Sequence, residues 1–225
     1  MTKGTKTLQI VFFDLWDTLI WEDPRTPFYA EVAHRLGVDT STFKNAYGAL
    51  GEAAMIGKIP TLSMRIYVAC QNMNVKIRPD RVKSIVQECI PLRLDAISLY
   101  PDTIQTLSSL QSKGYRLGII SNAFAWSEVV LDTMELRRYF DSVVLSYTCG
   151  TVKPMPQIYI HALREIGERP EGCFFVGDGR DSELDGAKQV GFTTILVDHC
   201  HRSLRADFKV DTLADAVQII TGNRV

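Results

Sequence analysis

The sequence predicts an α/β fold in which a doubly wound parallel sheet carries a smaller, all-helical domain. Two observations predict it. Short apolar runs alternate with amphipathic segments of helical length through residues 95–225, and a similar run, Leu8–Phe13, stands near the start. Residues 21–94 contain only helical patterns. Alternation of this kind is typical of a parallel sheet covered by helices on both faces.

Buried parallel strands are expected where Val, Ile and Phe cluster without alternating with polar residues. Such runs are Leu8–Phe13, Tyr115–Ile120, Ser142–Ser146, Cys173–Val176 and Thr193–Val197. Helical periodicity predicts helices over Asp102–Lys113, Ser127–Met134, Gln157–Gly167, Ser182–Val190 and Thr212–Ile220. The first of these helices follows a proline and ends at a glycine, a common start-and-stop pair.

Strands and helices do not alternate in the region after the first strand, because no strand is evident between Ile20 and Tyr100. Helical patterns cover Phe28–Leu36, Thr42–Ile56, Leu62–Asn72 and Asp80–Ile90, and prolines separate them. We therefore predict a Rossmann-like core of residues 1–20 and 95–225 and a helical cap of residues 21–94. The cap would lie over the carboxyl edge of the sheet, where ligands bind in such folds.

Composition narrows the partners that we expect. The 225 residues are 46% hydrophobic, which is enough for a core domain and a smaller second one. Lys and Arg number 25 against 26 acidic residues, so neither a nucleic-acid surface nor a membrane surface is predicted. Five cysteines without a CxxC pattern favour a reducing, cytoplasmic location. We expect a monomer or a homodimer that acts on a small molecule.

Polar residues follow four of the predicted strands, at the edge where parallel strands end. Each group alone fits an ordinary turn, helix cap or solvated loop. Together they would place a carboxylate, hydroxyls, a cation and a second carboxylate side by side, a set able to hold a phosphate and a divalent metal. The residues are Asp14 with Thr18, Ser121 with Asn122, Lys153, and Asp178 with Asp181 and Glu183.

These groups, in this order, resemble the four motifs of the haloacid dehalogenase-like hydrolase superfamily, and the resemblance covers essentially the whole chain. The matching segments are FDLWDTL (13–19), SN (121–122), KP (153–154) and GDGRDSELDGA (177–187). A helical insert after the first motif is similar to the subfamily that carries a cap there. No GxxxxGK[ST] occurs and no GxGxxG follows the first strand, which argues against a nucleotide-binding module.

The resemblance implies a catalytic set of Asp14, Thr18, Ser121, Asn122 and Lys153. In such enzymes the residue matching Asp14 is a nucleophile that forms a covalent aspartyl intermediate. The residues matching Ser121 and Asn122 contact the substrate. The residue matching Lys153 neutralises the nucleophile and the transferred group.

A Mg²⁺ site is also implied by the resemblance. Asp178 would bind the ion together with Asp14 and the main-chain carbonyl of Trp16, since this hard cation prefers oxygen ligands. Glu183, or Asp181 in its place, would hold a metal-bound water or orient the lysine.

Trp16 departs from the pattern of the family's phosphatases, which usually carry Asp at this position. That Asp protonates the leaving alcohol and then activates water, whereas an indole N–H is only a donor. Loss of a general acid/base costs about 10² to 10⁴ in rate. Asp17, Glu22 or Asp23 could supply the proton instead.

Three interpretations therefore stay open. The first is a Mg²⁺-dependent phosphatase for small phosphorylated metabolites with good leaving groups. The second is a 2-haloacid dehalogenase-like enzyme, because halide leaves without a proton. Two features argue against it: the carboxylate of Asp178, and the lack of a clear arginine to bind the substrate carboxylate. Arg25 and Arg35 are the nearest candidates for that arginine. The third is a non-catalytic protein that binds a phosphorylated ligand or a partner. In the cap, we expect Arg65 to contact a substrate anion.

Overall fold

A six-stranded sheet forms the centre of the protein, in a computed structural model that describes residues 10–199 and 205–222. The strand order is β5-β4-β1-β6-β7-β8, and every neighbouring pair is parallel. The strands are β1 (Ile10–Phe13), β4 (Arg116–Ser121), β5 (Ser142–Leu145), β6 (Phe174–Gly177), β7 (Thr193–Val197) and β8 (Phe208–Val210). The predicted doubly wound α/β fold is confirmed.

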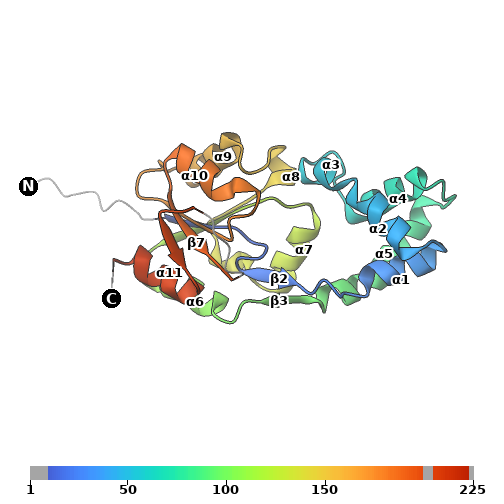
Figure 1. Ribbon diagram of the computed structural model, residues 1–225, viewed down its shortest axis with the longest axis horizontal. Helices are drawn as coiled ribbons and strands as arrows, with labels where there is room; N and C mark the ends of the chain where they lie inside the picture. Colours follow the sequence, from blue (N-terminus) through green and yellow to red (C-terminus); the bar gives the residue numbers. More distant parts are fainter. Residues whose placement is uncertain (1–9, 200–204, 223–225) are drawn as a thin grey trace, which may run out of the picture.

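Helices cover both faces of the sheet (Figure 1). Along β1, Ile10 and Phe12 join one core cluster, and Val11 and Phe13 join the other, so the strand is buried on both sides. This double burial explains why β1 is an unbroken apolar run. One face carries α9 (Pro156–Ile166) and α10 (Glu183–Val190), and the other carries α6 (Thr103–Ser112) and α11 (Leu213–Ile220). The remaining core helices are α7 (Trp126–Thr133), α8 (Ser146–Cys149), η1 (Arg137–Tyr139) and η2 (Arg180–Ser182).

Two short strands contradict the expectation that no strand lies between Ile20 and Tyr100. Strands β2 (Ile20–Glu22) and β3 (Ile97–Leu99) pair as an antiparallel ribbon. Each has only three residues, which is too short for a period-two pattern to be recognised. Edge strand β8 was also not predicted, because its residues are partly exposed. Leu8, in the first predicted strand, lies outside the described residues.

Five helices follow β2 and lie at the end of the molecule remote from β7 (Figure 1), and four of them pack against one another. Side-chain caps start two of them, since Asp39 accepts the Thr42 N–H at 2.9 Å and Thr61 accepts the Met64 N–H at 3.1 Å. The helices are α1 (Phe28–Leu36), α2 (Thr40–Gly48), α3 (Gly51–Met55), α4 (Leu62–Asn72) and α5 (Pro79–Leu94).

Two of the predicted helix boundaries in this region are wrong. The stretch predicted as one helix, Thr42–Ile56, is divided between α2 and α3, with Gly48 and Gly51 flanking the break. Helix α5 does not stop at Ile90 but continues through Pro91 for one more turn. Pro91 removes only the hydrogen bond that its own N–H would donate to the preceding turn, and the helix continues beyond it.

The β2–β3 ribbon connects these five helices to the sheet, and α3 also contacts α8 (Figure 1). Strand β2 crosses the predicted boundary between residues 20 and 21, whereas β3 lies within the predicted core segment 95–225. Both domain boundaries stay a prediction. Among the described residues, every helix is too short or too polar to cross a lipid bilayer. The described cysteines, Cys70, Cys89, Cys149 and Cys173, are all free thiols, and Cys200 lies outside the described residues.

Helix α10 packs against the loop that carries Lys153 with no space for a side chain at Gly186. A Cβ there would lie 2.8 Å from Pro154 Cα. We predict that Gly186→Ala lowers the free energy of unfolding by about 1 to 3 kcal/mol, as overpacked sites do. Urea denaturation measures this change.

Gly48→Ala is the matched control, because a Cβ at this helical glycine meets nothing within 4 Å. It should leave the free energy of unfolding unchanged or raise it by up to about 1 kcal/mol. Equal losses in the two variants would contradict tight packing at Gly186.

Candidate active site

The predicted polar residues gather at the carboxyl edge of the three central strands. Asp14 directly follows β1, Ser121 ends β4, and Asp178 directly follows β6. The Asp14 N–H donates to the carbonyl of Val176 in β6 at 2.9 Å, which fixes the start of the loop after β1. The chain runs outward from β1 in both directions, so this edge is a topological switch point, the usual place for a ligand crevice.

A buried lysine joins two of the carboxylates. Lys153 is 3% exposed, its Nζ lies 2.6 Å from Asp14 Oδ1, and it also pairs with Glu183. The other oxygen of Glu183, Oε1, accepts the N–H of Gly179 at 2.9 Å. Gly177 makes this possible, because a Cβ there would lie 2.8 Å from Glu183 Cδ. One ammonium group is thus shared by two buried carboxylates.

Burial and charge act against each other in this cluster. Burial raises the pKa of Glu183 above its ordinary value; the Lys153 charge opposes the rise, and the negative charge of Asp14 adds to it. Burial alone would lower the pKa of Lys153, but the charges of Asp14 and Glu183 outweigh it and raise that pKa. Lys153 is therefore a cation at neutral pH.

Two buried hydroxyl groups at the site have no hydrogen-bond partner. They are Ser121 Oγ, in a residue that is 1% exposed, and Thr18 Oγ1, in a residue with no exposed surface. A buried polar atom without a partner is costly. Ser121 lines the cavity described below, so its hydroxyl is available to a bound molecule there.

Asn122 lines the cavity, as expected, and its amide is hydrogen-bonded to protein groups. Its Oδ1 accepts the Lys153 N–H at 2.6 Å, and its Nδ2 donates to the Lys153 carbonyl at 3.1 Å. The same Nδ2 donates to Asp181 Oδ2 at 3.2 Å, which turns the exposed Asp181 toward Asn122. Asn122 therefore holds the Lys153 loop in place.

Asp178 is buried, and both of its carboxylate oxygens contact Arg180. The Arg180 N–H donates to Asp178 Oδ1 at 3.1 Å, and Arg180 Nε lies 3.2 Å from Asp178 Oδ2. Arg180 also pairs with Asp17, a residue held at a φ of 57°. Nothing in the spacing of the sequence singled out Arg180, although it lies inside the GDGRDS segment.

Carboxylate oxygens of Asp14, Asp178 and Glu183 lie within 4.8 Å of one another. They border a cavity of about 230 Å³ whose lining holds six carboxylates against three cations. Of these carboxylates only Asp14, Asp178 and Glu183 are buried, and their oxygen atoms suit a hard divalent ion. The lining residues are Asp14, Trp16, Asp17, Glu22, Arg93, Ser121, Asn122, Phe124, Lys153, Asp178, Arg180, Asp181 and Glu183.

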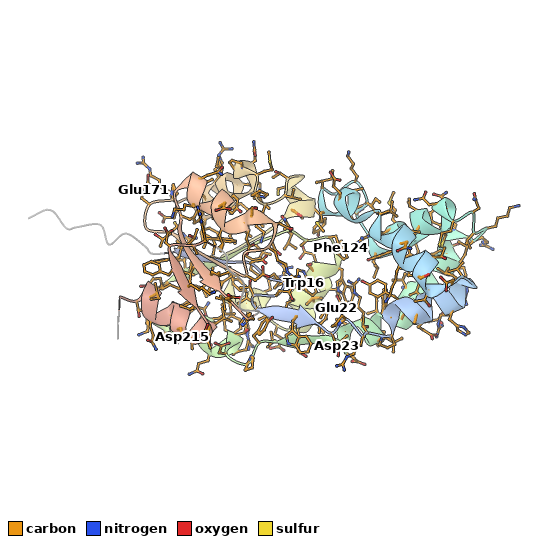
Figure 2. The ribbon with its side chains drawn as sticks, in the orientation of Figure 1. Trp16, Glu22, Asp23, Phe124, Glu171 and Asp215 are labelled. Carbon is orange, nitrogen blue, oxygen red and sulfur yellow. The ribbon has the colours of Figure 1, made fainter. Side chains whose placement is uncertain are left out.

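Trp16 borders this cavity with its polar atom already engaged. Its Nε1 donates to Ser127 Oγ of α7 at 3.0 Å, so the indole is held against that helix. Figure 2 shows Trp16, Glu22 and Phe124 in the region between the sheet and helices α1–α5. The indole therefore forms a wall of the cavity and has no proton to offer.

Three carboxylates could supply the proton that Trp16 cannot, and each of them forms an ion pair with an arginine. Asp17 pairs with Arg180. Glu22 and Asp23 pair with arginines of their own, Arg93 and Arg25. Asp17 and Glu22 line the cavity, and Asp23 does not.

The remaining expected residues lie elsewhere. Arg65 lines a second cavity and not the first. Arg25 is exposed, and Arg35 pairs with Glu31 and Glu88 on the outer surface of the helices. Arg93 was missed, although it continues, at helical spacing, the face of α5 on which Val86 and Cys89 are buried.

Comparison with known proteins agrees with this geometry. The family model described as haloacid dehalogenase-like hydrolase matches residues 8–191. A glyceraldehyde 3-phosphate phosphatase of Pyrococcus furiosus is 27% identical over 201 residues, covering 84% of this chain and 80% of that protein. One from Methanopyrus kandleri is 35% identical over 101 residues, which are 44% of this chain and only 42% of that protein.

Solved structures show the same fold. A phosphatase from Thermococcus onnurineus superposes with a TM-score of 0.71 at 23% identity, covering 97% of this chain and all of the other. A 2-haloacid dehalogenase from Pseudomonas syringae superposes with a TM-score of 0.72 at 20% identity, with the same coverage. With the family model matching most of its length, the chain belongs to the haloacid dehalogenase-like hydrolase family.

Proposed function

We propose that this protein is a Mg²⁺-dependent phosphatase that releases phosphate from small phosphorylated metabolites through a phosphorylated Asp14. One observation carries the proposal: the buried Asp14 carboxylate lies 2.6 Å from the Lys153 ammonium, beside the unpartnered hydroxyl of Ser121. A nucleophile, a cation and a free donor are the three groups that phosphoryl transfer to a carboxylate requires.

The names of relatives support a phosphorylated substrate. Besides the glyceraldehyde 3-phosphate phosphatases, a phosphoglycolate phosphatase of Aquifex aeolicus is 33% identical over 130 residues. The matched part is 61% of that protein and less than half of the Methanopyrus kandleri relative. We extend only the substrate class, a small phosphate monoester, to this chain.

In the proposed reaction, one Asp14 oxygen attacks phosphorus while the P–O bond to the leaving alcohol breaks. Lys153 and Ser121 contact the phosphoryl oxygens, whereas the buried Thr18 does not line the cavity. Water then attacks the phosphorus of the acyl phosphate, the P–O bond to Asp14 breaks, and inorganic phosphate leaves as the Asp14 carboxylate is regenerated. Asn122 acts through the Lys153 loop that it holds, so its role is to position the lysine.

Mg²⁺ would be held by Asp14, Asp178 and the main-chain carbonyl of Trp16. The excess of carboxylates around the cavity supports a divalent ion in this position. Once bound, the ion would offset the charge of the nucleophile and the phosphate. Glu183 lies beside this group and orients Lys153, whereas the exposed Asp181 contacts Asn122 instead.

Trp16 limits the substrates that the enzyme can use rapidly. With its N–H donated to Ser127, the side chain cannot protonate a leaving alcohol. We propose that the enzyme prefers phosphate compounds whose leaving group is already a weak base, such as aryl or acyl phosphates. Helices α1–α5 would form the cap that covers the reaction, in a cytoplasmic monomer or homodimer.

Replacement of the nucleophile tests the reaction itself. Asp14→Asn should lower Mg²⁺-dependent phosphate release from p-nitrophenyl phosphate at least about 10³-fold, because an amide cannot accept the phosphoryl group. Asp185→Asn, which changes an exposed carboxylate on α10, serves as the matched control and should keep its rate. Halide release from 2-chloropropionate without metal, in the absence of phosphatase activity, would instead favour the dehalogenase interpretation.

Introduction of the missing acid/base tests the role of Trp16. Trp16→Asp should raise kcat/KM at least about tenfold for alkyl phosphates and much less for aryl phosphates, which need little protonation. Ser127→Ala breaks the hydrogen bond to the indole without adding a carboxylate, so it should give no such gain. Equal changes on both substrate classes would contradict this explanation of Trp16.

A further inference from the structure

A second cavity adjoins the one that contains Asp14. Its volume is about 510 Å³, and Glu22, Arg93 and Phe124 line both cavities. The second cavity lies among residues of the five helices and of the segment after β2. A molecule with its phosphate near Asp14 would therefore extend past Arg93 into this space.

Arg93 carries a buried donor that no group among the described residues accepts. The residue is 3% exposed, and its Nε and Nη2 donate to the two oxygens of Glu22 at 3.1 and 3.2 Å. Its Nη1 is buried without a hydrogen-bond partner. The guanidinium carbon lies 5.6 Å from the Phe124 ring centre and 4.9 Å from that of Trp126, so aromatic faces surround it and offer no acceptor.

Two further buried residues with donor groups, Tyr47 and Arg65, line the second cavity. Tyr47 is 4% exposed, and its hydroxyl has no hydrogen-bond partner. Arg65 is 6% exposed and donates only to the Tyr47 carbonyl, at 3.0 and 3.2 Å. Among the described residues no carboxylate pairs with Arg65, and burial lowers its pKa.

The charge balance of the second cavity is opposite to that of the first. Lys44, Arg65 and Arg93 line it together with two carboxylates, Glu22 and Asp23. Asp23 is already neutralised by Arg25, which does not line this cavity. Positive charge is therefore in excess here, next to rings that would contact a flat organic group.

We propose that Arg93 Nη1, with Tyr47 and Arg65, binds a second anionic group on the leaving alcohol of the substrate. The substrate class is a phosphate monoester that also carries a carboxylate or a second phosphate, attached through an aromatic or other flat group. This proposal rests on the phosphatase function proposed above and specifies the substrate of the same site.

Matched aryl phosphates test the proposal on the unmodified enzyme. The probes are 3- and 4-carboxyphenyl phosphate, their methyl esters, and benzene-1,4-diyl bisphosphate. A charge-assisted hydrogen bond to a buried arginine predicts that kcat/KM for the better carboxylate isomer exceeds that for its ester about tenfold to a hundredfold. The bisphosphate distinguishes a preference for phosphate from one for carboxylate.

Arg93→Lys keeps the charge of Arg93 but removes the free Nη1 group. It should reduce the ratio of kcat/KM between acid and ester to within about threefold of unity. Arg25→Lys, in the segment after β2 and outside both cavities, is the matched control and should keep the wild-type ratio of kcat/KM between acid and ester. Circular dichroism of both variants checks that they are folded.

The two proposals fail in different ways. Turnover of the esters and of p-nitrophenyl phosphate with no preference for any second anion would overturn the anion site and leave the phosphatase function standing. Absence of phosphate release from every substrate would overturn the function. In that case calorimetric binding of the acid and ester probes decides the anion site: equal affinities overturn it, and an Arg93-dependent preference for the acids supports it.

Discussion

The buried ion pairs of Lys153 are the interaction on which the site depends. One ammonium group is shared by Asp14 and Glu183, and all three side chains are nearly inaccessible to water. Removal of Lys153 would cost about 3 to 5 kcal/mol, because the buried carboxylates would lose the cation that they share. The local structure around Lys153 serves this contact: Asn122 fixes its loop, and Gly177 gives the Glu183 carboxylate room above β6.

Charge also distinguishes the two ends of the combined cavity. At the edge of the sheet carboxylates outnumber cations, which favours a metal ion together with a phosphate. Around the second cavity, between the helices, the buried arginines Arg65 and Arg93 retain unused charge or donors. A substrate with a phosphate at one end and another anion at the other would satisfy both regions. Trp16 borders the first region as an apolar wall, held by Ser127.

The sequence alone was sufficient to predict the positions of those site residues that follow from the strand order. Asp14, Ser121 and Asp178 end neighbouring parallel strands, so their convergence could be predicted. The β2–β3 ribbon could not, because its strands are three residues long and far apart in the chain. The Glu22–Arg93 pair joins residues 71 positions apart, and no local pattern encodes such a contact. Likewise, the bonds of Asn122 to the Lys153 loop depend on tertiary structure alone.

The most direct test of the central claim is to trap the phosphorylated enzyme. The protein would be mixed with p-nitrophenyl phosphate and Mg²⁺, quenched in acid, digested and examined by mass spectrometry. Because Trp16 cannot activate water, hydrolysis of the acyl phosphate should be slow and the intermediate should accumulate. We predict a phosphate on the peptide that contains Asp14, absent from Asp14→Asn. Continued turnover with no phosphate on Asp14, or with phosphate on another residue, would contradict the claim.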